Sequence, residues 1–144
     1  MLKGLLPQPS QFRWLAIPLA LASVAGVATT AYSQSLTTPL SGTVQVNGVS
    51  GGSQSSACGN LPAAPSQTLQ VTEAFASLDI ALQGEGKVTL LIQGPGGFSE
   101  CRTTDRFSDG RITSPGLLNQ GLYNIYVGNE TAAQTPYTLT ISQN

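Results

Sequence analysis

The residues Gly121–Gly128, GLYNIYVG, and Pro136–Ser142, PYTLTIS, decide the fold class of this chain. In both stretches large apolar or aromatic side chains recur at every second position, first Tyr123, Ile125 and Val127, then Tyr137, Leu139 and Ile141. A period of two residues places alternate side chains on opposite faces of a β-strand. The sequence therefore predicts two strands, each with one buried face.

The same alternation, or a short apolar run, occurs upstream at residues 44–46, 69–71, 78–82 and 88–92. Turn-forming residues separate these segments, among them Gly84-Glu85-Gly86, Gly94–Gly97, Asp109-Gly110 and Pro115-Gly116. Short strands at intervals of about ten residues are typical of an antiparallel sandwich or barrel. We therefore expect an all-β antiparallel β-sandwich of two sheets over residues 41–144. Residues 50–66 are expected to form a loop, and Pro115-Gly116 to interrupt a strand.

The first 33 residues have the pattern of a secretory signal peptide. Two cations precede an uncharged run, Trp14–Ala28, and the small-residue exit Ala31-Tyr32-Ser33 follows. The run of about fifteen residues is shorter than the roughly twenty that span a bilayer. We expect cleavage after Ser33, a short leader at residues 34–40, and a secreted or periplasmic protein. An uncleaved membrane anchor is the alternative.

The charge of the chain excludes two classes of partner. Only 9% of the residues are charged, against about 25% in an average domain, and there is no His. Beyond residue 33, seven acidic residues face four basic ones. Nucleic acids and anionic membranes require a basic patch that such a domain lacks. We therefore expect no nucleic-acid partner, and membrane contact only through an uncleaved signal peptide.

The two cysteines, Cys58 and Cys101, are expected to form a disulfide. Two cysteines in an exported chain most simply pair with each other. Closing the long loop between them stabilises the fold by about 4 kcal/mol in the chain-entropy model. Free thiols or a metal pair are the alternatives, but a chain without His offers few further metal ligands.

Ser50 lies in Gly48-Val49-Ser50-Gly51-Gly52, which matches the G-x-S-x-G pattern of serine hydrolases. In those enzymes the serine sits between a strand and a helix and needs a general base. Here a Gly/Ser/Pro-rich segment follows, and the chain has no His. Lys87 is formally available as a base, but nothing in the sequence places it beside Ser50. We therefore expect a glycine-rich turn, no catalytic residues and no cofactor.

Three acidic residues, Glu100, Asp105 and Asp109, suggest a calcium loop because carboxylates are hard oxygen ligands. Their spacing matches no EF-hand, and three nearby arginines offset their charge. A solvated loop anchored by Cys101 is the simpler interpretation, and no metal is assigned. Asn129-Glu130-Thr131 is a formal glycosylation sequon in a predicted loop.

Aromatic side chains are the usual platforms for sugars on β-sandwiches. Tyr126 points away from the row of Tyr123, Ile125 and Val127, and Phe98 follows a glycine-rich turn. These two residues are the candidates for a ligand-facing position. Most of the other aromatic residues are expected to pack in the core.

The segments 77–97 and 112–142 resemble the bacterial pre-peptidase C-terminal domain. The positions that carry the resemblance are Gly121, Tyr123, Ile125, Val127, Tyr137, Leu139 and Ile141, within residues 67–144. The chain is also similar to short secreted cyanobacterial proteins of unassigned function, a match that extends toward residue 41 and includes both cysteines. The acidic residue often found in the central strand of the pre-peptidase family is absent from KVTLLIQ, residues 87–93.

The resemblance implies a jelly-roll-like domain that assists secretion, targeting or substrate attachment without catalysis. We therefore expect a secreted, non-catalytic binding or accessory module. Its partner would be a protein or polysaccharide of the envelope or the secreted fraction. A self-associating structural component and a weak carbohydrate-binding module are the alternatives.

Overall fold

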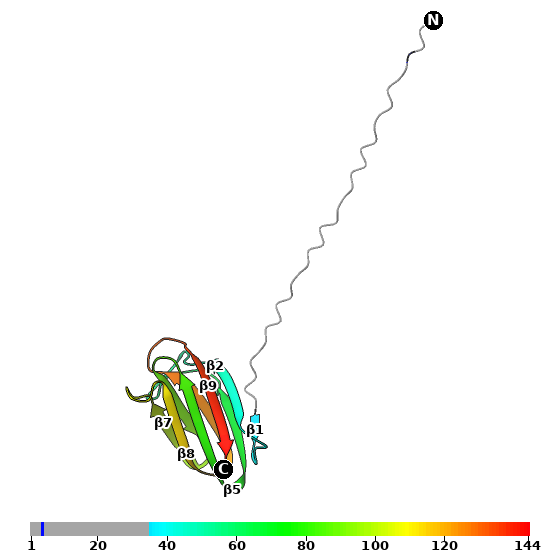
Figure 1. Ribbon diagram of the computed structural model, residues 1–144, viewed down its shortest axis with the longest axis vertical. Coiled ribbons are helices and arrows are strands. Elements are labelled where there is room, and N and C mark those ends of the chain that lie inside the picture. The colour runs from blue at the N-terminus through cyan, green and yellow to red at the C-terminus, as the bar shows by residue number, and fades with distance from the viewer. Residues whose placement is uncertain (1–3, 5–34) are drawn as a thin grey trace. The chain divides into compact units, whose positions relative to one another are not determined.

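The computed structural model describes Gly4 and residues 35–144 (Figure 1). Apart from Gly4, the predicted signal peptide at residues 1–33 lies outside the described residues, and its cleavage stays a prediction. In the part of the chain that is described, no helix has the length and apolar character to cross a membrane.

The regular secondary structure of the described chain is β-structure, apart from one 3-10 turn. Its strands are β1 (Ser35–Thr37), β2 (Val44–Val49), β3 (Gln54–Ser56), β4 (Gly59–Leu61), β5 (Gln67–Gly84), β6 (Val88–Gln93), β7 (Ser99–Thr103), β8 (Arg111–Asn129) and β9 (Pro136–Gln143), with a 3-10 turn η1 (Pro95–Gly97). The order along the sheet is β2-β9-β5-β8-β4-β3. In addition, β1 pairs with β5, and β6 pairs with both β8 and β7. All pairs are antiparallel except β1–β5.

Two long strands, β5 and β8, run through both halves of this sheet. The first half consists of β2, β9 and the paired segments 75–84 and 111–119. The second half consists of β1, segments 67–71 and 121–129, β6 and β7. One core cluster contains buried side chains from both halves, so their inner faces pack together. The two sheets of the predicted sandwich are therefore halves of one curled sheet.

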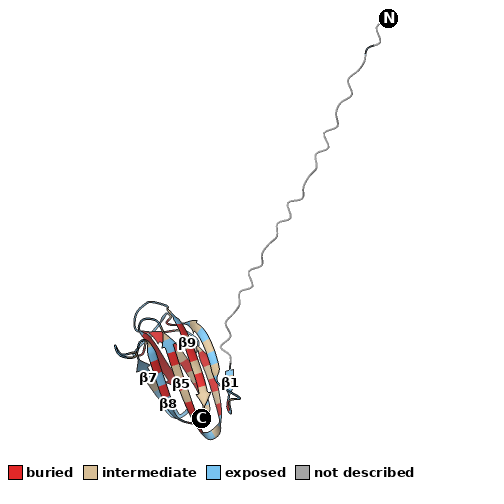
Figure 2. Ribbon diagram, in the orientation of Figure 1, coloured by how far each residue is buried: buried red, intermediate tan, exposed pale blue. Residues whose placement is uncertain are grey.

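Both long strands change their inward-facing positions where the sheet bends. In β5 the buried residues have odd numbers up to Val71 and even numbers from Ala76 onward. A shift in the strand register separates Val71 from Phe75. In β8 the buried apolar residues have even numbers up to Leu118 and odd numbers from Tyr123 onward. Gly121, whose φ is +146°, lies between these two parts. The extra bulge residues and the unusual glycine backbone let each strand bend while both halves face one core. Figure 2 shows the resulting alternation of buried and accessible positions.

Pro115-Gly116, predicted to interrupt a strand, instead lies within β8. This segment pairs with β5 on one side, whereas β4 and β6 pair only with residues 124–129 of β8. The other edge of segment 111–119 is thus without a paired strand in the described chain. Proline lacks an N–H group but is tolerated on such an edge.

Two segments predicted to be irregular contribute strands. Residues 50–66, predicted to be a loop, contain the β3–β4 hairpin, in which Gly59 has a φ of +82°. Within residues 34–40, predicted to be a leader, β1 pairs with β5. All three strands, β1, β3 and β4, are only three residues long and lack an apolar alternation, which is why the sequence pattern missed them.

The predicted disulfide is confirmed, with Cys58 and Cys101 joined at a Cα–Cα distance of 5.8 Å. It links the β3–β4 hairpin to β7. Cys58, Leu61 and Leu91 form a second buried cluster, against which Tyr126 packs. The hairpin therefore covers part of the outer surface of the second half.

Candidate functional site

Ser50 is a buried structural residue that links the end of β2 to the segment before β9. Its side chain is 0% exposed. The hydroxyl lies 2.9 Å from the hydroxyl of Thr135 and accepts hydrogen bonds from the Thr135 backbone N–H and from Nδ2 of Asn129. Thr135 in turn donates to the carbonyl of Glu85. This network gives the G-x-S-x-G match a structural explanation.

Asn129, the acceptor residue of the formal sequon, belongs to the same network. Its side chain is 1% exposed, and Oδ1 accepts hydrogen bonds from the backbone and hydroxyl of Thr131. The amide nitrogen that a glycan would join already donates to Ser50 and Thr135. In the folded protein this amide is therefore inaccessible for glycosylation.

The three candidate calcium ligands have separate local roles. Glu100 on β7 accepts hydrogen bonds from Ser114 and from Arg102, with which it also forms a salt bridge. Asp105 accepts from the backbone N–H of Phe107, and Asp109 has a φ of 49° in the turn before β8. No group of three or more potential metal ligands occurs among residues 35–144 and Gly4. The structure thus does not bring the three together as a metal centre.

The two candidate ligand-facing aromatic residues are not on one surface. Phe98 is 38% exposed and packs edge-to-face on Tyr123, with 5.8 Å between the ring centroids. Tyr126 is half-buried against the cluster around the disulfide. Since Tyr123 and Tyr126 lie on opposite faces of β8, Phe98 and Tyr126 cannot form one platform. Phe98 instead lines a cleft of about 90 Å³, together with Glu100 and Ser114.

The outer surface of the first half is an extended polar face. We call it the polar face, and it consists of Gln45, Asn47, Asp79, Ala81, Gln83, Arg111, Thr113, Pro115, Thr138, Thr140 and Ser142. The strand register arranges these residues in rows across the strands. One row is Gln45–Thr140–Ala81–Thr113, and another is Asn47–Thr138–Gln83–Arg111. The apolar residues between them point to the core, so the sheet itself fixes the positions of the polar groups.

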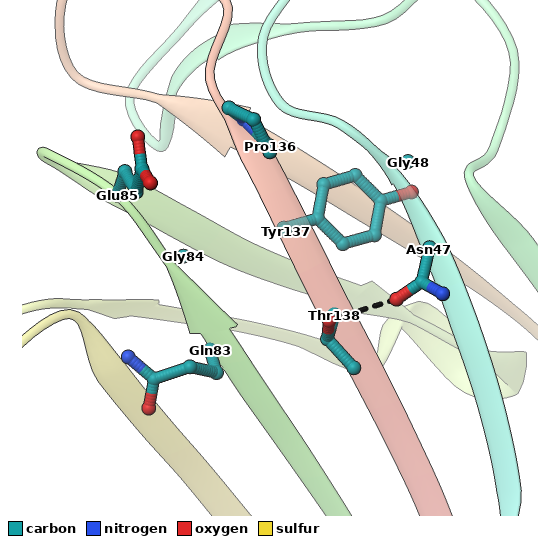
Figure 3. Close-up of a pocket in the computed structure, with 8 residues that line it drawn as sticks. All are labelled: Asn47, Gly48, Gln83, Gly84, Glu85, Pro136, Tyr137 and Thr138. Atoms are coloured by element: carbon teal, nitrogen blue, oxygen red, sulfur yellow. Dashed lines mark hydrogen bonds between the residues drawn. The ribbon is translucent and has the colours of Figure 1, made fainter.

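Two hollows lie on this face. The first, of about 480 Å³, is lined by Asn47, Gly48, Gln83, Gly84, Glu85, Pro136, Tyr137 and Thr138 (Figure 3). The second, of about 410 Å³, is lined by Asp79, Ile80, Ala81, Arg111, Thr113, Ser114, Pro115, Thr140 and Ser142. Ala81, with the smallest side chain of the polar face, lies between Thr140 and Thr113 in the second hollow.

Glycine and tyrosine shape the floor of the first hollow. Gly48 and Gly84 are the register partners of Tyr137 on either side. A Cβ at Gly48 would lie 2.5 Å from the hydroxyl oxygen of Tyr137, so the ring occupies the space that glycine leaves. Figure 3 shows the Tyr137 ring extending toward Gly48. Burial raises the pKa of Tyr137, and a hydrogen bond with Ser66 opposes this shift.

The polar groups around the two hollows differ in whether they already form hydrogen bonds within the protein. Thr138 donates to Oδ1 of Asn47 at 2.8 Å, and Gln83 donates to the carbonyl of Asp109 at 2.9 Å. The hydroxyls of Thr113, Thr140 and Ser142 have no hydrogen bond within the described residues. The second hollow therefore presents free hydroxyl groups to solvent.

Sequence reasoning missed this face because its signal is the same as that of any solvated strand surface. Thr138, Thr140 and Ser142 were identifiable as the residues opposite the buried row of β9. Their alignment with Ala81 and Thr113 depends on the pairing of strands that are far apart in the chain. Strand order cannot be deduced from alternation alone.

No family model matches the chain. Among solved structures it is similar to the pre-peptidase C-terminal domain of collagenase from Bacillus anthracis, as its C-terminal strands predict. That match has a TM-score of 0.49 and 13% identity, and covers 77% of this chain and 97% of the other. The periplasmic g-type lysozyme inhibitor PliG of Aeromonas hydrophila is similar with a TM-score of 0.41 and 18% identity, over 77% and 96% of the chains.

A sequence relative is the uncharacterized protein Synpcc7942_2126 of Synechococcus elongatus. The two sequences are 34% identical over 104 residues, which cover 69% of this chain and 75% of the relative. This match agrees with the predicted similarity to cyanobacterial proteins of unassigned function. The chain therefore belongs to the same protein family as Synpcc7942_2126 of Synechococcus elongatus.

Proposed function

We propose that this chain is an exported, non-catalytic β-domain that binds a macromolecule of the envelope or the secreted fraction through its polar face. The observation that carries the proposal is the presence of two adjacent hollows on one rigid sheet surface. Binding sites are concave and largely preformed, with a few polar groups that fix the orientation of the ligand.

Export is supported by two independent features. The first 33 residues have the composition of a signal peptide, and the disulfide links two segments that are distant in sequence. Disulfides of this kind persist in oxidising compartments. A non-catalytic role is supported by the burial of Ser50, whose hydroxyl is held by Thr135 and Asn129.

The proposal is tested by affinity capture with two matched variants. Ala81→Lys fills the second hollow at the centre of the polar face. Gln70→Lys adds the same side chain to the same strand, β5, on the outer surface of the second half. The oxidised exported protein and both variants are immobilised and exposed to the host's envelope and secreted fractions, and retained proteins and polysaccharides are identified.

We expect the wild type and Gln70→Lys to retain the same partner and Ala81→Lys to lose it. Equal retention by Ala81→Lys would show that the polar face is not the site. Recovery of the protein alone would favour the self-associating structural role. Pro115 on the free edge of β8 is unfavourable for that role at this edge, because proline cannot donate to an added strand.

A further inference from the structure

We propose that the ligand of the polar face is a neutral polysaccharide, which lies along β9 and β5 with Ala81 beneath it. This inference rests on the proposed function and deepens it by naming the class of ligand. It is drawn from the direction of the two hollows, from the free hydroxyl groups around Ala81 and from the charges at the rim.

The two hollows follow one another along the same pair of strands. On β9, Pro136–Thr138 line the first hollow, and Thr140 and Ser142 line the second. On β5, Gln83 and Gly84 line the first hollow, with Glu85 directly after the strand, and Asp79–Ala81 line the second. At about 3.3 Å per residue, the six steps along β9 correspond to a trough about 20 Å long. An extended polymer fills such a trough, whereas a compact small molecule occupies one hollow.

The side chains around the second hollow match the hydrogen-bonding character of a sugar chain. Thr140 and Thr113 stand on either side of Ala81 in one cross-strand row. Their hydroxyls, like that of Ser142, have no hydrogen-bond partner among the described residues. A hydroxyl can both donate and accept, as can each hydroxyl of a sugar. The methyl group of Ala81 leaves room for a sugar ring between the two threonines.

The charges at the rim favour a neutral polymer over an acidic one. Asp79 lines the second hollow and Glu85 the first, whereas Arg111 is the one cation among the residues that line either hollow. Asp79 already accepts a hydrogen bond from Asn144 at 2.7 Å. The two linings together carry two carboxylates and one guanidinium, so they present no basic patch for a polyanionic chain, whereas a neutral chain needs none.

Affinity electrophoresis of the oxidised exported protein tests this inference. Native gels contain a neutral polysaccharide, either hydroxyethyl cellulose, glucomannan or dextran, or the polyanion alginate. We expect retardation in at least one of the neutral gels and none in alginate. Thr140→Val and Thr113→Val remove one hydroxyl each and keep the β-branched shape. Each is expected to weaken binding by about threefold to tenfold, the factor for one lost hydrogen bond.

Thr68→Val is the matched control, because Thr68 lies on the outer surface of the second half. It is expected to bind like the wild type, and circular dichroism verifies that all three variants are folded. The absence of retardation in every neutral gel overturns the inference, as does retardation in alginate alone. If Ala81→Lys also abolishes capture of a protein from the envelope, the proposed function stands and only the ligand class is wrong.

Discussion

The side-chain amide of Asn129 donates a hydrogen bond across 3.3 Å to the hydroxyl of Ser50, a residue 79 positions earlier in the chain. Both side chains are almost completely buried. The bond joins the end of β2 to the end of β8, and Thr135 extends the link to the start of β9. A serine in a hydrolase-like pattern thus has a role in closing one end of the curled sheet.

Replacing Ser50 by Ala is expected to destabilise the protein by about 1–3 kcal/mol, because the buried amide of Asn129 loses a partner. Urea unfolding measures the change. Ser53→Ala is the control, since Ser53 is exposed and makes no side-chain hydrogen bond within the described residues. Equal stability of the two variants would show that the buried network contributes little.

The disulfide is expected to make a large contribution to stability. Cys58 and Cys101 are separated by 43 residues, and opening such a loop costs about 4 kcal/mol in the chain-entropy model. Unfolding of the double variant Cys58→Ala/Cys101→Ala is compared with that of the oxidised wild type. The reduced wild type serves as the second reference. If the double variant and the reduced wild type each lose less than 1 kcal/mol in the free energy of unfolding, packing holds the β3–β4 hairpin in place without the covalent link.

The bend of β8 at Gly121 provides a third prediction. A Cβ at Gly121 would lie 2.6 Å from Cγ of Pro95, and its φ of +146° is unfavourable for other residues. Gly121→Ala is therefore expected to cost about 1–3 kcal/mol. Gly116→Ala, on the same strand, meets no atom within 4 Å and is expected to be neutral or slightly stabilising. Thermal unfolding distinguishes the two, and equal melting temperatures would contradict the role assigned to Gly121.

Glu73, in the bulge of β5, connects the N-terminal segment to the last strand. Its carboxylate accepts hydrogen bonds from Thr38 and from Gln143, whose side-chain oxygen accepts from the backbone N–H of Leu40. Thr38 is itself buried and bonded to Thr72 through its hydroxyl and carbonyl. The hydrogen bond from Thr38, followed by that from Gln143, lowers the pKa of Glu73 below its ordinary value of 4.5.

This lowered pKa predicts a defined pH dependence of stability. The folded protein binds the Glu73 proton less readily than the unfolded chain does, so the ionised carboxylate stabilises the fold fully above pH 4.5. The stabilisation is lost as the pH falls through the folded-state pKa. Glu73→Gln is therefore expected to lose less stability than the wild type between pH 7 and acidic pH in urea unfolding. Glu130→Gln, at an exposed residue, is the control, and parallel pH profiles for wild type and Glu73→Gln would contradict the prediction.

The sequence was sufficient to predict the strands that have an apolar alternation and to predict the disulfide. The rows Tyr123–Val127 and Tyr137–Ile141 are buried as their period of two residues predicts. The sequence was not sufficient to predict that β5 and β8 are continuous strands. A bulge in β5 and Gly121 in β8 interrupt the alternation, while the hydrogen-bonded ladder between the two strands continues. Alternation reports which residues are buried, whereas bends within one strand depend on tertiary packing.

The candidate site was harder to predict for a related reason. Exposed aromatic residues are a recognisable signal that points to Phe98 and Tyr126. The Phe98 ring, however, packs on Tyr123 at one face of β8, whereas Tyr126 belongs to the opposite face. The polar face consists of common residues whose combination depends on strand order. Thr140, Ala81 and Thr113 become neighbours only after β9, β5 and β8 have paired.

The most direct measurement of the binding face is an NMR titration of the oxidised, ¹⁵N-labelled protein with the neutral polysaccharide that causes the strongest retardation in affinity electrophoresis. We expect the amide shifts to change mainly at residues 79–85, 111–115 and 136–142. Changes concentrated around Tyr126 and Leu91, on the outer surface of the second half, would contradict this expectation. The same holds for a spectrum that does not change at all.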